Sequence, residues 1–133
     1  MKSTELMIGD WVSVEDLIRC RVDKIFQDYV VCLDKRDNEI IGNIMPIPLT
    51  PEILEKNGFD NEGYYRLPIN ENMSLEYYMY EHRLRKWYRG VDGWQNHSII
   101  KDITFQCQCH YVHELQHALR LCGMNELADD FKI

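Results

Sequence analysis

"CQCHYVHELQHALRLCG", residues 107–123, decides how the C-terminal half of this chain is expected to fold. Its first residues end a run from Ile99 to Cys109 in which apolar and polar side chains alternate, as in a strand with one buried face. From Val112 onward the apolar residues recur at helical spacing, and Gly123 is the kind of residue that ends many helices. The stretch therefore predicts a strand that turns into a helix over about residues 111–122.

The strand and the helix are each predicted to bury one face. The residues expected on the buried strand face are Ile103, Phe105, Cys107 and Cys109. The residues expected on the buried helix face are Val112, Leu115, Leu119 and Cys122. Since successive helical residues are about 100° apart, His113, His117 and Arg120 fall on the opposite arc and are expected to face solvent.

The same helix spells HELQH, which matches the HExxH pattern of zinc peptidases. In that pattern two histidines one turn apart hold zinc, and the glutamate polarises a water molecule. This gives an alternative function, a zinc-dependent hydrolase with His113 and His117 as metal ligands and Glu114 as catalytic base. Arg120 places a cation beside the two histidines, which disfavours a divalent metal. The candidates for a third ligand require a sharp reversal of the chain and are Glu126, Asp129 and Asp130.

Five cysteines, an odd number with uneven spacing, indicate reduced thiols in the cytoplasm. Two further uses of them are weighed. A structural zinc site would draw on Cys107, Cys109, His110 and His113. A thiol nucleophile would combine Cys109 with His113 and Glu114. We favour the interpretation that the cysteines are small apolar core residues, so no cofactor is expected.

The N-terminal part, residues 1–49, reads as four or five short strands joined by tight turns, and it predicts a small antiparallel β-barrel. Residues 50–58 then predict a short linking helix. Thr50 is a good N-cap, Pro51 fits the first helical position, and Gly58 supplies a stop.

The remainder, residues 59–133, is expected to be an α+β lobe that ends in the helix. Residues 74–89 fit a helix or strands, and their aromatic content favours strands. In a strand, four residues share one face, namely Arg83, Arg85, Trp87 and Arg89. Bases mixed with aromatic rings are typical of single-stranded nucleic-acid binders, which gives a third alternative function. The net charge of −7 argues against nucleic acid and favours a solvated edge strand.

The composition predicts one compact α+β unit. A chain of 133 residues with 45% apolar residues is long enough to build a core. Residues 1–10 lack an apolar signal segment, and no apolar run is long enough for a membrane span. These observations predict a cytoplasmic protein that does not bind membranes.

Three segments resemble a family of small uncharacterised proteins carried by gut anaerobic bacteria and their phages or mobile elements. They are "LMIGDWV", "PIPLTPEILEKNGF" and "YVHELQHALRLCG". The resemblance implies an accessory intracellular protein of phage or mobile-element origin. The family has no assigned activity, cofactor or catalytic residue, so no role is carried onto a position of this chain.

The function favoured by the sequence is a non-enzymatic protein-binding or adaptor module with an unidentified protein partner. Small barrels offer grooves for such contacts, although this is an analogy at the level of the fold.

Overall fold

The computed structural model describes residues 5–91 and 99–133 and has an α+β fold with two five-stranded antiparallel sheets. The first sheet is built from β1 (Trp11–Val14), β2 (Ile18–Ile25), β3 (Val30–Leu33), β4 (Glu39–Ile40) and β5 (Ile44–Met45). The second sheet is built from β6 (Asp60–Asn61), β7 (Tyr65–Pro68), β8 (Met73–Tyr78), β9 (Arg83–Val91) and β10 (Ile99–Gln108). The helices are α1 (Pro51–Lys56), α2 (Val112–Leu121) and α3 (Asn125–Asp129).

The first sheet has the order β4-β3-β2-β1-β5 and does not close into a barrel within the described residues, so the prediction of a barrel over residues 1–49 is wrong. Only residues 41–43 connect the edge strands β4 and β5. Four residue steps reach about 14 Å, whereas the edges of a flat five-stranded sheet lie about 19 Å apart. The sheet must therefore curl, but edge strands of two residues are too short to form a closing ladder.

Gly42 lies where this connection crosses the end of β1. A Cβ atom at Gly42 would lie 2.6 Å from Cγ1 of Val14 and 2.9 Å from Oε1 of Glu15. The same Glu15 oxygen accepts a hydrogen bond from the Asn43 backbone N–H at 2.7 Å. The curled sheet encloses a small core of its own, formed by Leu6, Val12, Val14, Cys20, Val22, Val30, Cys32 and Ile44.

The linking helix α1 has the caps that the sequence predicts. The Thr50 hydroxyl accepts a hydrogen bond from the Ile53 backbone N–H at 3.3 Å, and Gly58 has a φ of +91°. Ile53 and Leu54 are buried in the core of the second sheet. The predictions for this helix are confirmed.

The second sheet has the order β10-β9-β8-β7-β6, and residues 74–78 and 83–89 lie in strands, as the aromatic content favours, with a turn between them. A bulge lies in β10 between Ile103, which pairs with Trp87, and Phe105, which pairs with Lys86. Because the extra residue shifts the alternation, Ile103 and Phe105 lie on opposite faces. Phe105 and Cys107 pack against the core as predicted, whereas Ile103 is 42% exposed, so its predicted place on the buried face is wrong.

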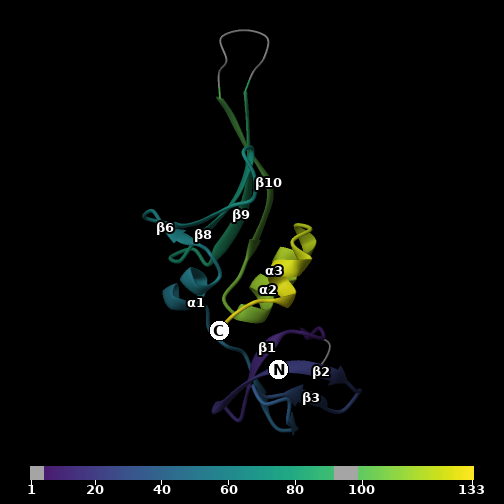
Figure 1. Cartoon of the computed structure of the whole chain (residues 1–133). Coiled ribbons are helices and arrows are strands. Elements are labelled where there is room, and N and C mark those ends of the chain that lie inside the picture. Colours follow the sequence, from purple (N-terminus) through teal and green to yellow (C-terminus); the bar gives the residue numbers. More distant parts are fainter. Residues whose placement is uncertain (1–4, 92–98) are drawn as a thin grey trace.

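Helix α2 lies between the two sheets, with α3 beside it (Figure 1). One face of α2 enters the main core through Val112, Leu115 and Leu119, as predicted. The side chain of Gln116 is fully buried, and its Oε1 accepts a hydrogen bond from the Trp11 backbone N–H at 2.8 Å. The Gln116 Nε2 donates to the carbonyls of Gly9 and Ala128, both at 3.0 Å. One side chain thus joins the first sheet, α2 and α3.

Among the helices in the described parts of the chain, none is long and apolar enough to cross a membrane.

Candidate functional site

Glu114, the candidate catalytic base of the HELQH motif, caps the start of α2. Its Oε1 accepts hydrogen bonds from the backbone N–H groups of His110 at 2.9 Å and Tyr111 at 3.1 Å. A carboxylate at this place satisfies N–H groups that a helix start leaves free, and it interacts favourably with the helix dipole. One oxygen of the Glu114 carboxylate is thus engaged in capping the helix start.

His117 faces the first sheet instead of solvent. Its Nε2 lies 2.6 Å from Oδ2 of Asp10, a carboxylate with no exposed surface. Asp10 also accepts hydrogen bonds from the Met7 backbone N–H at 2.8 Å and from Nη1 of Arg120 at 3.1 Å. A buried carboxylate requires such partners, so His117 and Arg120 hold α2 against the Gly9–Asp10 turn.

His113 is only 6% exposed, and its Nδ1 is buried without a hydrogen-bond partner among the described residues. Burial lowers the pKa of His113 below the usual value, while the nearby carboxylates of Asp10, Glu114 and Glu5 act in the opposite direction. The prediction that His113, His117 and Arg120 face solvent is therefore wrong. The arc of α2 that faces away from the main core packs against the N-terminal lobe.

A cavity of about 680 Å³ lies beside this part of α2. It is lined by Glu5, Met45, Pro46, Tyr111, His113, Glu114 and His117. Among residues 5–91 and 99–133, no group of three or more histidine, cysteine, aspartate or glutamate side chains converges as a metal site. One of the carboxylates considered as third ligand, Asp129, lies 3.5 Å from Nη2 of Arg120. A zinc-dependent hydrolase would therefore have two histidine ligands here, and no third ligand converges on them within the described chain.

The cysteine-based alternatives draw on side chains that the fold separates. The Sγ atoms of Cys107 and Cys109 lie 3.6 Å apart, but His110 is exposed and packs on the ring of His82 at 4.4 Å between centroids. The hydrogen bond shared with Cys107, together with burial, raises the pKa of the Cys109 thiol. A fully buried thiol with a raised pKa is a poor nucleophile. These contacts support the interpretation of Cys109 as a core residue.

Arg83, Arg85 and Trp87 share one face of β9, as the strand prediction requires. The fourth residue of the nucleic-acid hypothesis, Arg89, has its side chain outside the described residues. The guanidinium of Arg85 lies 4.9 Å from the ring centroid of Tyr78 and 3.3 Å from Glu81.

This face also holds a carboxylate that sequence reasoning missed. Glu76 is 2% exposed, pairs with Arg85 across the strands, and accepts a hydrogen bond from the Tyr78 hydroxyl at 2.6 Å. Its neighbour Ser74 faces Trp87 in the same ladder. A buried carboxylate beneath the arginine and the ring reduces the attraction of this face for phosphates.

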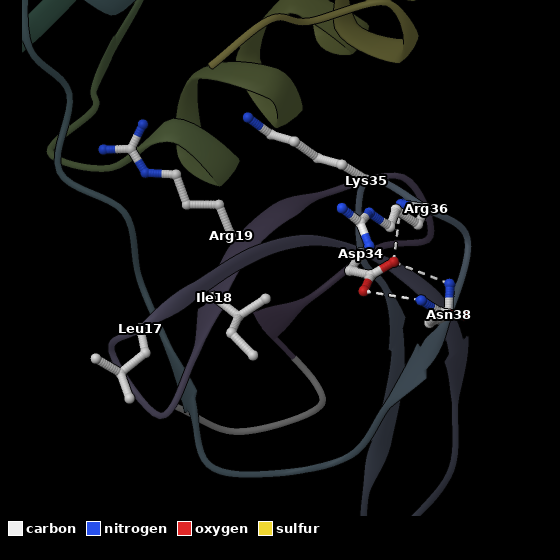
Figure 2. Close-up of a pocket in the computed structure, with 7 residues that line it drawn as sticks. All are labelled: Leu17, Ile18, Arg19, Asp34, Lys35, Arg36 and Asn38. Carbon is white, nitrogen blue, oxygen red and sulfur yellow. Dashed lines mark hydrogen bonds between the residues drawn. The ribbon is translucent and has the colours of Figure 1, made fainter.

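Figure 2 shows basic side chains that the sequence did not single out, beside the turn between β1 and β2 and in a second turn, between β3 and β4. Arg19, Lys35 and Arg36 line a shallow cavity of about 480 Å³ beside the exposed Leu17. Asp34 shapes the second turn, because its Oδ1 accepts hydrogen bonds from the backbone N–H groups of Arg36 and Asn38. These hydrogen bonds lower the pKa of Asp34. The three cations are exposed, so the surface lacks a buried polar group that would fix a ligand.

The outer edge of β10 is the longest unpaired strand edge among the described elements. The other edge strands, β4, β5 and β6, have two residues each, whereas β10 has ten. Residues 103–109 carry no carboxylate, amine or guanidinium. Apart from its ladder with β9, the described part of β10 makes no further backbone–backbone hydrogen bond.

The direction of the free backbone groups follows from the ladder. The Cys109 backbone N–H donates to the His82 carbonyl at 2.7 Å, so the groups of Cys109 point toward β9. The register runs without a break from Phe105 to Gln108. Since N–H and C=O directions alternate along an antiparallel strand, Gln106 and Gln108 point theirs away from the sheet. Both residues are exposed.

Comparison of the chain with protein-family models, with curated proteins and with solved structures finds no match. The family resemblance of the three sequence segments stays a prediction.

Proposed function

We propose that this protein is a non-enzymatic protein-binding or adaptor module, and that it binds an extended segment of a partner by adding a strand to the outer edge of β10. The observation that carries the proposal is the uncharged, unpaired edge over residues 103–108. Strand addition derives affinity from main-chain hydrogen bonds and specificity from alternate side chains.

Proteins protect free edges by short strands, charges, prolines or bulges. The three other sheet edges of the described chain follow this rule, since each ends in a two-residue strand. β10 carries one bulge, near Thr104, and beyond it four residues without a charge or a proline. An edge of this kind is a template for another strand.

The side chains around the edge favour a partner segment with apolar residues at every second position. On the helix-covered side, Phe105 and Cys107 are half-buried against the core. Cys122, which follows α2, packs against the same core. An added strand would place alternate side chains on this apolar side, and the intervening ones beside Gln106 and Gln108.

The alternative sites support this choice indirectly. The HELQH side chains stabilise the helix start and the junction between the lobes, and Arg85 is engaged with Tyr78 and Glu81. We infer further that the protein acts in the cytoplasm, where its five unpaired cysteines stay reduced.

The test uses a labelled strand peptide and fluorescence anisotropy. The probe has the sequence of residues 101–109 with serine at both cysteine positions. A second probe also carries proline at the position of Gln106. We expect the first probe to bind the full chain and the second to bind at least about tenfold more weakly, because two edge hydrogen bonds are lost or distorted. Equal binding of both probes, or binding of neither probe to a chain that is monomeric at the concentration used, would overturn the proposal.

A further inference from the structure

We infer that the partner at the β10 edge is a second copy of this chain, paired antiparallel about a two-fold axis close to Gln106. This inference rests on the proposed strand-addition function and names its partner. The pairing joins the second sheet of one copy to the second sheet of the other, which gives one continuous sheet of ten strands.

The charge pattern of the β10 edge suits pairing with a second copy. In a two-fold pair, residues near the axis face themselves or their close neighbours, so any charge there meets the same charge on the other copy. Residues 103–109 form a window of seven residues without a carboxylate, amine or guanidinium, in a chain with 22 acidic and 15 basic residues. The free edge therefore lacks the like-charge repulsion that two acidic copies would otherwise meet.

The direction of the backbone groups at Gln106 allows a two-fold register. Gln106 points its N–H and C=O outward, so two copies can exchange both hydrogen bonds at the position where Gln106 faces its symmetry mate. The same register opposes Phe105 to Cys107 and Gln108 to Thr104, once in each direction. Every pair from residue 104 to residue 108 then stays inside β10.

The apolar and polar faces of β10 also match between the two copies. A two-fold axis perpendicular to a sheet keeps the same face of both copies on the same side. Phe105 and Cys107, which both pack against the core that the helices share, therefore meet each other across the axis. The exposed Gln106 and Gln108 meet polar residues on the other face. Each copy offers the alternation of apolar and polar side chains that the edge of the other requires.

Pairing of this kind also closes on itself. An isologous contact uses the free edge of both copies, whereas a heterologous contact would leave an edge open for further addition. An uncharged β-prone segment is an aggregation hazard when it stays exposed. The two-fold pair removes that hazard at the dimer.

The experiment measures the mass of the full chain in solution by sedimentation equilibrium over a range of concentrations. Gln106→Pro removes an outward N–H without removing a hydrogen bond to β9, and Gln106→Ala is the matched control that keeps the backbone donor. We expect a dimer for the unmodified chain and for Gln106→Ala. We expect at least about tenfold weaker dimerisation for Gln106→Pro, since two hydrogen bonds are lost.

A charge-complementation pair covers the case in which Gln106→Pro does not fold. Gln106→Lys and Gln106→Glu change only an exposed side chain. Each variant alone opposes like charges at the axis and is expected to dimerise up to about fivefold more weakly. An equimolar mixture of the two opposes unlike charges and is expected to recover the dimer.

The outcomes separate this inference from the proposed function. A chain that stays monomeric but binds the residue 101–109 probe overturns the second copy as partner and leaves strand addition standing. A dimer that Gln106→Pro and both charge variants leave unchanged places the interface elsewhere and overturns the inference. Failure of both dimerisation and probe binding overturns both proposals.

Discussion

The two sheets treat their edges in opposite ways. The first sheet ends in two-residue strands on both sides, and three residues carry the chain across its curled opening. The second sheet ends in the short β6 on one side and in the ten-residue β10 on the other. The first sheet thus encloses a core of its own, whereas the second leaves main-chain groups available. This contrast is the basis on which we propose a binding role for the outer edge of β10.

The contrast would break down if the two sheets unfolded independently, and Gln116→Leu tests the joint between them. The substitution leaves the Trp11 N–H and the carbonyls of Gly9 and Ala128 without their buried partner. We expect the free energy of unfolding to fall by about 4 kcal/mol, at about 1–3 kcal/mol for each buried unsatisfied group. Denaturant unfolding followed by tryptophan fluorescence measures the loss.

Gln27→Leu is the matched control, because Gln27 lies exposed between β2 and β3. It is expected to change the free energy of unfolding by less than about 0.5 kcal/mol. A similar small change for Gln116→Leu would show that the junction contributes little.

Gly42→Ala tests whether the short connection between β4 and β5 holds the first sheet curled. The new Cβ would lie 2.6 Å from Cγ1 of Val14, so the connection must move away from the end of β1. We expect a loss of about 2 kcal/mol in the free energy of unfolding, the usual effect of overpacking. Thermal unfolding of this variant beside Ile41→Ala, at a site that is 62% exposed, gives the comparison. An unchanged melting temperature would mean that the connection does not hold the sheet curled.

Acidification is expected to have the smallest effect and acts at the junction. Burial lowers the pKa of His113 in the folded chain, while the unfolded chain keeps a value near about 6.5. Below that pH the unfolded state binds more protons, so the free energy of unfolding decreases as the pH falls toward the folded pKa. Denaturant midpoints across this range should decline less steeply in His113→Gln than in His110→Gln, which alters an exposed histidine. Parallel declines would remove His113 as the cause.

Local signals made much of the fold predictable from the sequence. Thr50, Pro51 and Gly58 bracket α1 because capping depends on neighbouring residues alone. The change from alternation to helical spacing near Tyr111 likewise placed the corner between β10 and α2.

The errors come from contacts between distant segments. Helical phase identified the apolar arc of α2, but it could not reveal that Asp10 comes to the opposite arc and pairs with His117, or that His113 on that arc is buried. The barrel does not close because β4 and β5 are too short to pair with each other. Ile103 lies on the exposed face because one bulge residue shifts the alternation of β10. The free edge of β10 also required the strand order, which composition does not encode.

The contacts of Trp11 have a consequence for how the chain is made. Its backbone N–H bonds to a residue 105 positions later, and its indole N–H bonds to the Phe131 carbonyl, 120 positions later. During synthesis the first sheet leaves the ribosome long before these partners exist. Since such distant contacts form late, the N-terminal lobe must wait with its helix-binding face uncovered until Gln116 and Phe131 have been made.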